Sequence, residues 1–180
     1  MLTEIVISGF GGQGGLFAGK CIAHAAMLSG MEVSWLPSYG PEMRGGTANC
    51  SVCISDTQIG SPLVNEPDIL IAMNTPSFDR FAHTVKSGGY IFTDSSITDR
   101  ICDRDDISVN YVSASQLAQE NGLSGMANVV LLGRTMKDCA DRLMGVNLKT
   151  LSETFKTIIP KSKSGLVDKN IQALMLGMEY

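Results

Sequence analysis

Hydrophobic positions along the chain fall into short continuous runs that are separated by longer segments of mixed character. Branched apolar residues fill the runs, and glycine, proline or polar residues bound them, which is typical of buried β-strands. The strands predicted in this way are 4–8, 32–36, 47–54, 68–73, 90–93 and 107–112. The segments between and after them carry helical patterns with glycine or proline near their ends. The predicted helices are 14–28, 75–86, 113–121, 126–144, 148–159 and 166–177. Thr75, followed by Pro76, is predicted to be the N-cap of the second of them.

This alternation of strands and helices predicts the α/β fold class. Strands that are apolar along their whole length indicate a mostly parallel sheet with helices on both faces, which makes three layers. The last third of the chain is predicted to be helical and to pack on the sheet, because about 55 residues make a poor core on their own. We therefore expect residues 1–180 to form a single domain.

Charged residues are scarce, and the shortage is concentrated in the N-terminal third. They make up 18% of the 180 residues, against roughly 25% in a typical soluble domain. Residues 1–60 contain six of them, and residues 99–106 alone contain another six. Because depletion of charge marks the centres of protein interfaces, we expect another chain to bury part of the N-terminal third. The net charge of −4 argues against nucleic acid or an anionic membrane as the main partner.

The N-terminal sequence predicts neither a signal peptide nor a membrane span. The apolar run that begins at Ile5 lacks a basic flank, and glycines interrupt the low-charge stretch 5–36. The five cysteines are odd in number and irregularly spaced, which is typical of reduced, mostly buried thiols. The expected location is the cytoplasm.

A glycine-rich turn follows the first predicted strand. Residues 9–14 match the pattern G-x-G-x-x-G between a strand and a helix. In nucleotide-binding proteins the first glycine permits a tight turn, the second lets the ligand approach the backbone, and the third lets helix and strand pack closely. The nicotinamide fingerprint also needs an acidic residue at the end of the second strand, where this sequence has Ser38. Phosphate or nucleotide binding and a purely structural or interface role both stay open. The candidate residues are Gly9, Gly11, Gly12, Gln13 and Gly14.

A second candidate loop, residues 38–46, follows the second predicted strand. Ligands of open parallel sheets bind at the carboxyl ends of strands, so this loop and the glycine-rich turn are expected to share a crevice. Arg44 is suited to recognise a phosphate or carboxylate, and a salt bridge to Glu42 or across a subunit interface is the alternative. The candidate residues are Tyr39, Gly40, Glu42, Arg44, Gly45 and Gly46, together with Asn74 after the fourth strand.

Three segments together resemble the gamma subunit of 2-oxoacid:ferredoxin oxidoreductases. They are the glycine-rich turn, the run Ser-Tyr-Gly-Pro-Glu-Met-Arg-Gly-Gly-Thr-Ala-Asn-Cys at 38–50, and Ile-Ala-Met-Asn at 71–74. The resemblance spans essentially the whole chain and is nearest to the 2-oxoglutarate:ferredoxin enzymes. It implies a Rossmann-like subunit of an enzyme that oxidatively decarboxylates a 2-oxoacid, with 2-oxoglutarate expected. The reaction uses coenzyme A and yields acyl-CoA, CO2 and reduced ferredoxin.

The resemblance also implies the cofactors and partners of the assembled enzyme. Thiamine diphosphate, Mg²⁺, coenzyme A and iron–sulfur clusters are expected on partner subunits and none on this chain. The expected partners are thiamine-binding alpha and beta subunits, with a small ferredoxin-like subunit as a further candidate. Ferredoxin is the expected electron acceptor of the complex.

The cysteines do not have the spacing of a metal or cluster site. Iron–sulfur clusters are held by runs such as C-x2-C-x2-C, and Cys50 and Cys53 are the closest pair in this chain. Both fall on one predicted strand, where an offset of three residues places the two thiols on opposite faces. No Gly-Asp-Gly…Asn-Asn segment for magnesium and diphosphate is present either. We therefore predict no metal site and no catalytic residue.

Other polar residues near predicted strand ends and in helices have two readings. His24 and His83 fall in predicted helices without an evident nucleophile partner, so structural roles are favoured over catalysis. The segments 73–74 and 94–96 follow strands and are expected either to line the crevice or to cap strand ends.

The leading hypothesis is a non-catalytic subunit of a larger enzyme. Its charge-poor N-terminal loops would be buried against the thiamine-binding subunits and would help to shape the coenzyme A or active-site entrance. The alternatives are a free-standing nicotinamide or nucleotide-binding oxidoreductase and a stand-alone nucleotide-binding regulatory module. The missing ribose carboxylate counts against the first alternative.

Overall fold

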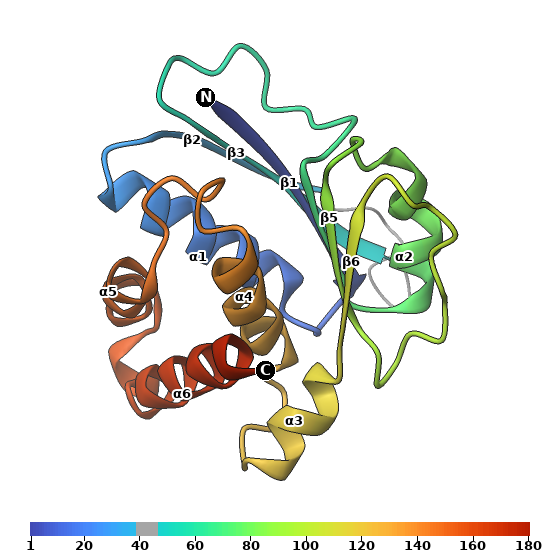
Figure 1. Cartoon of the computed structure of the whole chain (residues 1–180). Coiled ribbons are helices and arrows are strands. Elements are labelled where there is room, and N and C mark those ends of the chain that lie inside the picture. Colours follow the sequence, from blue (N-terminus) through green and yellow to red (C-terminus); the bar gives the residue numbers. More distant parts are fainter. Residues whose placement is uncertain (39–46) are drawn as a thin grey trace.

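The computed structural model describes residues 1–38 and 47–180, and its strands form one six-stranded sheet flanked by helices (Figure 1). The strands are β1 (Leu2–Phe10), β2 (Glu32–Ser38), β3 (Thr47–Ser55), β4 (Ile69–Ala72), β5 (Tyr90–Asp94) and β6 (Ser108–Val112). The helices are α1 (Gly15–Leu28), α2 (Thr75–Phe81), α3 (Ala114–Glu120), α4 (Ala127–Asp138), α5 (Leu148–Ile158) and α6 (Gly165–Glu179), with 3-10 turns at Ala82–Thr84 and Lys161–Lys163. The predicted α/β class and the helical C-terminal part are confirmed.

The sheet is mixed, with the strand order β2-β3-β1-β4-β5-β6. β1, β4, β5 and β6 pair in parallel, whereas β3 is antiparallel to both of its neighbours, β1 and β2. The prediction of a mostly parallel sheet therefore holds, with β3 as the exception. Its physical reason is the short connection from Ser38 to Thr47, because a parallel crossover needs about a dozen residues or more.

The antiparallel β3 still leaves the two candidate loops at one edge of the sheet. Phe10, the last residue of β1, pairs with Thr47 at the start of β3, and Ser38 at the end of β2 pairs with Asn49. The carboxyl ends of β1 and β2 thus lie on either side of the first residues of β3. The strand ends that precede the two loops are therefore at the same edge of the sheet, with β3 between them.

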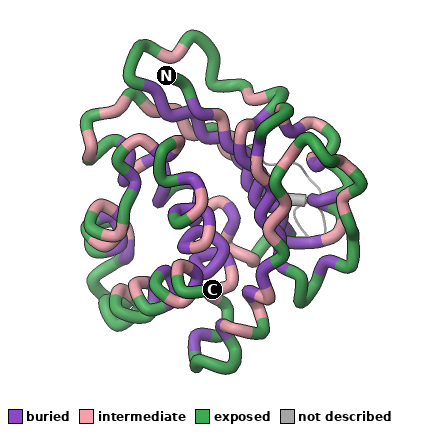
Figure 2. Tube along the Cα trace, viewed as in Figure 1, coloured by how far each residue is buried: buried purple, intermediate pink, exposed green. Residues whose placement is uncertain are grey.

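Apolar side chains on the two faces of the sheet pack against different helices. On one face Ile5, Ile7 and Ile71 are buried against α1, α4, α5 and α6. On the other face Val6 and Leu70 are buried against α2 and the turn that follows it. Figure 2 shows buried residues running along the central strands and on the helix sides turned toward the sheet. Helices therefore cover both faces, as predicted, but most of the helical mass lies on one.

Two predicted helices are shorter in the structure. The helix predicted over 126–144 ends at Asp138, and Met144 and Gly145 have φ angles of 37° and 89°, which no right-handed helix accommodates. The helix predicted over 75–86 ends at Phe81 and continues as a 3-10 turn. There the Thr84 hydroxyl donates to the Phe81 carbonyl oxygen over 2.8 Å and competes with helical bonding.

The helices α4 and α6 approach each other closely because glycines lie at their crossing. A Cβ atom added at Gly177 would collide with the carbonyl oxygen of Val130, and one added at Gly133 would collide with the carbonyl oxygen of Leu174. Both clashes are with backbone atoms, which cannot move without separating the helices. The position of α4, whose first turns border the glycine-rich turn, therefore depends on these two glycines.

We predict that Gly177→Ala lowers the free energy of unfolding by about 3 kcal/mol, because overpacking a tight helix crossing forces backbone shifts. Chemical denaturation followed by circular dichroism measures the change. The matched control is Gly165→Ala in the same helix, where an added Cβ meets nothing within 4 Å. Equal stabilities of the two variants would contradict the role assigned to the crossing.

Candidate functional site

The glycine-rich turn lies at the point of the sheet where chain connections diverge. It links the end of β1 to the start of α1. In the sheet, β1 lies between β3 and β4. In open α/β sheets such a switch point is the usual place for a ligand. Gly12 and Gly14 have φ angles of 99° and 83°, a region that favours glycine, so both are required by the backbone path.

The side chain of Gln13 is hydrogen-bonded to the ends of β1 and β4. Its Oε1 accepts hydrogen bonds from the Phe10 backbone N–H over 2.6 Å and from the Asn74 Nδ2 over 2.9 Å. Its Nε2 donates to the Met73 carbonyl oxygen over 3.3 Å. The Gln13 N–H also donates to the Phe10 carbonyl oxygen over 3.1 Å, which closes the turn. The Gln13 amide therefore joins the turn to the residues that follow β4.

The structure changes the reasons expected for two of the glycines. Gly9 is a paired residue of β1, not a turn residue, and a Cβ there would lie 2.8 Å from the Gln13 Oε1. A Cβ at Gly14 would collide with the amide of Asn128, which donates to the Gly14 carbonyl oxygen over 3.1 Å. Gly9 thus makes room for Gln13, and Gly14 makes room for α4 rather than for the strand.

Asn74 joins the turn to the start of α2. Its side chain is fully buried, donates to Gln13, and accepts a hydrogen bond from the Ser77 backbone N–H over 2.9 Å. Asn74 is therefore the N-cap of α2, and the prediction that Thr75 caps this helix is wrong. The amide side chain succeeds as the cap because it has both an acceptor for the helix and a donor for the turn.

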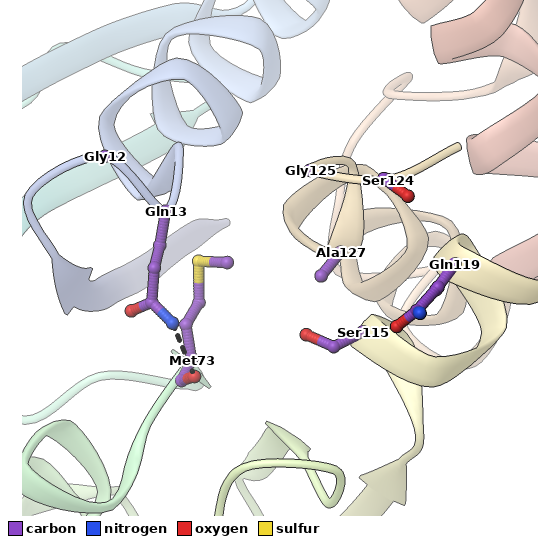
Figure 3. A pocket seen from close by; sticks show the side chains of 8 residues that line it. All are labelled: Gly12, Gln13, Met73, Ser115, Gln119, Ser124, Gly125 and Ala127. Atoms are coloured by element: carbon purple, nitrogen blue, oxygen red, sulfur yellow. Dashed lines mark hydrogen bonds between the residues drawn. The ribbon is translucent and has the colours of Figure 1, made fainter. Parts of the chain in front are cut away.

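A cleft of about 320 Å³ opens beside the turn (Figure 3). One wall is formed by the turn and the end of β4, and the other by α3 and the segment that enters α4. The lining residues are Gly12, Gln13, Met73, Ser115, Gln119, Ser124, Gly125 and Ala127. Of the described residues that line it, none carries a charge, so the cleft offers hydroxyls, amides and backbone groups only.

The far wall of the cleft was missed by the sequence analysis. Ser115 is held there by Asp94, a fully buried carboxylate whose Oδ2 accepts hydrogen bonds from the Ser115 backbone N–H over 3.1 Å and the Ser115 hydroxyl over 2.5 Å. The Asp94 Oδ1 accepts from the Ser96 N–H over 3.0 Å. The segment 94–96 therefore positions the wall without lining the cleft. The one indication in the sequence was that the helix predicted at 113–121 directly follows a predicted strand. That strand is β6, which runs parallel to β5, so its carboxyl end lies at the same edge of the sheet as that of β5.

The N-terminus of α1 lacks both of the usual side-chain partners. Gly14 provides no side-chain cap, and the first turn contains no acidic residue. Its free N–H groups are the feature that favours an anion at such a turn. The exposed Ser38 at the end of β2 nevertheless does not fit a nicotinamide dinucleotide, which needs a carboxylate there for the ribose.

The remaining candidate residues belong to the second loop. Tyr39, Gly40, Glu42, Arg44, Gly45 and Gly46 lie outside the described residues. What the structure establishes is the position of the flanking strand ends, Ser38 and Thr47, at the same edge of the sheet as Phe10.

The histidines make structural contacts or lie away from the cleft. The His24 Nδ1 is 3.0 Å from the Thr154 hydroxyl, which links α1 to α5. His83 is exposed in the 3-10 turn after α2. Neither residue lines the cleft, in agreement with the structural reading of both.

The five cysteines are free, and four of them are buried. Cys50 packs in the core beside α1, whereas Cys53 lies on the opposite face of β3 and donates to the Ser61 carbonyl oxygen over 3.8 Å. The prediction that these two thiols face apart is confirmed. Burial raises the pKa of Cys21 and Cys139 to about 12 and that of Cys50 to about 11, so these thiols stay protonated at neutral pH. Within residues 1–38 and 47–180, no group of three or more potential metal ligands comes together.

Comparison with known proteins assigns the family. The family model described as pyruvate ferredoxin/flavodoxin oxidoreductase matches residues 4–180. The chain belongs to this family. Its resemblance to the gamma-type subunit of 2-oxoacid:ferredoxin oxidoreductases, noted from the glycine-rich turn and the run 38–50, is thereby confirmed.

Relatives of this gamma-type chain carry different names. It is 41% identical over 179 residues to the ketoisovalerate oxidoreductase subunit VorA of Methanothermobacter thermautotrophicus, covering 99% of this chain and 36% of VorA. It is 34% identical over 183 residues to the 2-oxoglutarate synthase subunit KorC of Methanocaldococcus jannaschii, covering 99% of this chain and 94% of KorC. The chain thus spans about a third of the length of the VorA relatives and nearly all of KorC.

A solved structure shares the fold of the gamma-type chain. The gamma subunit of a keto/oxoacid ferredoxin oxidoreductase from Geobacter sulfurreducens superposes with a TM-score of 0.82 at 27% identity, covering 98% of this chain and 96% of that one. In the part of the chain that the structure describes, no helix is long and apolar enough to cross a membrane.

We predict that a thiol reagent such as Ellman's reagent at pH 8 modifies Cys102 first in the folded chain. Cys102 is partly exposed, whereas the other four cysteines are buried. Desolvation raises the pKa of each of those four thiols, so the reactive thiolate is scarce. Absorbance at 412 nm follows the reaction, and the Cys102→Ser chain is the control that should lose the fast phase. A fast phase that persists in this control would show that a buried thiol opens.

Proposed function

We propose that this chain is the gamma subunit of a multi-subunit 2-oxoacid:ferredoxin oxidoreductase. The assembled enzyme oxidatively decarboxylates a 2-oxoacid with coenzyme A and releases acyl-CoA, CO2 and reduced ferredoxin. The observation that carries the proposal is the family match over residues 4–180, since it includes the glycine-rich turn, the second loop and the far wall of the cleft.

The role proposed for this chain is assembly and the shaping of the active-site entrance, without catalysis. General acid–base or nucleophilic chemistry needs a titratable group within hydrogen-bond reach of the substrate. The described lining of the cleft supplies hydroxyls, amides and backbone groups, with no acid, base or thiol among them. The cleft is suited to hold a neutral part of a coenzyme at its entrance, while the reacting groups are supplied from elsewhere in the complex.

Cofactors are assigned to the partner subunits. Thiamine diphosphate with Mg²⁺ would supply decarboxylation and iron–sulfur clusters would supply electron transfer. Both would be held by alpha and beta subunits and by a small ferredoxin-like subunit where one is present. Ferredoxin would accept the electrons. The chain itself is proposed to act as a single Rossmann-like domain, with one antiparallel strand in its sheet, in the cytoplasm.

Two substrates are supported by different relatives. The match to nearly the full length of KorC favours 2-oxoglutarate, which we propose as the substrate. The higher identity to VorA favours a branched-chain 2-oxoacid as the second candidate. 2-Oxoglutarate carries a second carboxylate on its side chain, where the branched-chain acid has an alkyl group. An enzyme for 2-oxoglutarate therefore needs an additional cation that the described cleft residues do not provide.

Reconstitution tests the proposed function. The isolated chain is expected to show no turnover, and mixing it with its co-purified alpha and beta subunits should restore reduction of ferredoxin or viologen with coenzyme A. Initial rates with 2-oxoglutarate, 3-methyl-2-oxobutanoate and pyruvate identify the substrate. Full activity of the chain alone would refute the proposal. Micromolar binding of NAD(P) by calorimetry would favour the free-standing oxidoreductase instead.

We predict that Arg44→Ala weakens complex assembly or the use of coenzyme A by about tenfold, the size expected for a lost charge-assisted hydrogen bond. The melting temperature of the isolated chain should stay the same, because the change affects a binding group and not the core. Analytical ultracentrifugation and the KM for coenzyme A measure the two effects. A complex with unchanged assembly and KM would remove Arg44 from the site.

A further inference from the structure

We propose that Gln13 is a positioning residue of the enzyme: its side-chain amide holds the Gly11–Gly12 backbone in the conformation that coenzyme A meets at the cleft. This inference rests on the proposed function, since it concerns the same cleft. It assigns to Gln13 an action through the loop, whereas the sequence pattern alone places this residue among possible direct ligands.

The first support is the number of separate segments that the Gln13 amide connects. It accepts from the Phe10 N–H and the Asn74 amide and donates to the Met73 carbonyl oxygen. The acceptor oxygen is thus shared between β1 and the cap of α2, and the donor reaches the end of β4. Figure 3 shows the Gln13 side chain extending from the turn toward Met73, with the hydrogen bond to the Met73 carbonyl oxygen dashed.

The second support is that the two glycines have few restraints besides the bonds that Gln13 makes. Gly11 and Gly12 are exposed, and a Cβ added at Gly12 would meet nothing within 4 Å. Their ends are fixed by the Phe10 N–H bond to the Gln13 side chain and by the Gln13 N–H bond to the Phe10 carbonyl oxygen. Without the side-chain bond, a glycine pair with wide conformational freedom would have to be ordered in each binding event.

The third support is that the opposite wall is built in the same way. Ser115 lines the cleft and is held from behind by the buried Asp94. Each wall of the cleft therefore has a polar group anchored behind it in the sheet edge. The ligand would meet surfaces that are ordered before it binds.

Two variants separate positioning from direct contact. Gln13→Met keeps the length of the side chain and removes all three hydrogen bonds. Gln13→Glu keeps an acceptor for the Phe10 N–H and the Asn74 amide and loses the donor to Met73. The control is Gln172→Met, the same substitution at an exposed residue of α6. Hydrogen exchange of the Phe10 amide in the full chain reports the state of the loop independently of activity.

In the reconstituted complex, Gln13→Met should raise the KM for coenzyme A about tenfold, as expected for the loss of preorganisation. The kcat and the KM for the 2-oxoacid should change less than about twofold. Gln13→Glu should recover most of the KM, and Gln172→Met should behave like the wild type. Exchange of the Phe10 amide should be about tenfold faster in Gln13→Met, with protection largely regained in Gln13→Glu.

Each other result counts against a specific claim. An unchanged KM in Gln13→Met would overturn the positioning role, whether or not the amount of assembled complex falls. An equal rise in KM for Gln13→Met and Gln13→Glu, with the Phe10 amide still protected in Gln13→Glu, would also overturn it, because direct contact would then explain the effect. A wild-type complex without activity would refute the proposed function itself, while the exchange measurement would still report on the loop.

Discussion

The hydrogen bonds of one side-chain amide fix the arrangement at the edge of the sheet where the chain connections diverge. The strands β1 and β4 are parallel neighbours, and beyond their carboxyl ends the chain leads into two different helices. The Gln13 side chain forms hydrogen bonds with the Phe10 N–H at the end of β1 and with the Met73 carbonyl oxygen after β4. It also accepts a hydrogen bond from Asn74, the N-cap of α2. Gly9 leaves the space that this amide needs. Two positions of the G-x-G-x-x-G pattern, Gly9 and Gln13, therefore serve a contact within the protein. The pattern of a dinucleotide site is present, but its Gln13 side chain is engaged in contacts within the protein.

The positions of the strands and helices and the mostly parallel sheet could be predicted from the sequence, but the direction of β3 and the contacts between distant residues could not. Apolar runs and glycine boundaries are local signals, and they located every strand of the described chain to within a few residues. The direction of β3 depends on the length of its connection, which carries no hydrophobic pattern. The N-cap of α2 is Asn74 and not the predicted Thr75, because the Asn74 side chain accepts from the Ser77 N–H and also donates to Gln13. Gln13 is 61 residues away in the sequence, so this contact leaves no local signal.

The candidate site shows the same limit more strongly. Its near wall could be predicted, since Gly12 and Gln13 belong to a motif with a known place between strand and helix. Its far wall comes from α3 and α4, and Ser115 and Gly125 belong to no motif that would have drawn attention to them. They reach the cleft because β6 ends at the same edge and because α4 is drawn in by its close crossing with α6. Sites assembled across a sheet edge in this way are visible only in three dimensions.

The shortage of charge in residues 1–60 has two physical causes. Much of α1 is buried between the sheet and the helices of the C-terminal third, where charges would be costly without partners. The other cause concerns what remains exposed, which includes Phe10, Met27, Leu28 and Leu36. Exposed apolar side chains in a charge-poor surface are typical of interface centres.

The same shortage extends into the cleft and restricts what this chain can do alone. Both a 2-oxoacid and coenzyme A are anions, and no described residue that lines the cleft offers a cation to either. In the sequence Arg44 falls between Ser38, the last residue of β2, and Thr47, the first residue of β3. A site whose neutral surfaces are on one chain and whose charges are supplied across an interface binds its ligands only after assembly. The scarcity of charge in the composition thus extends to the described lining of the cleft.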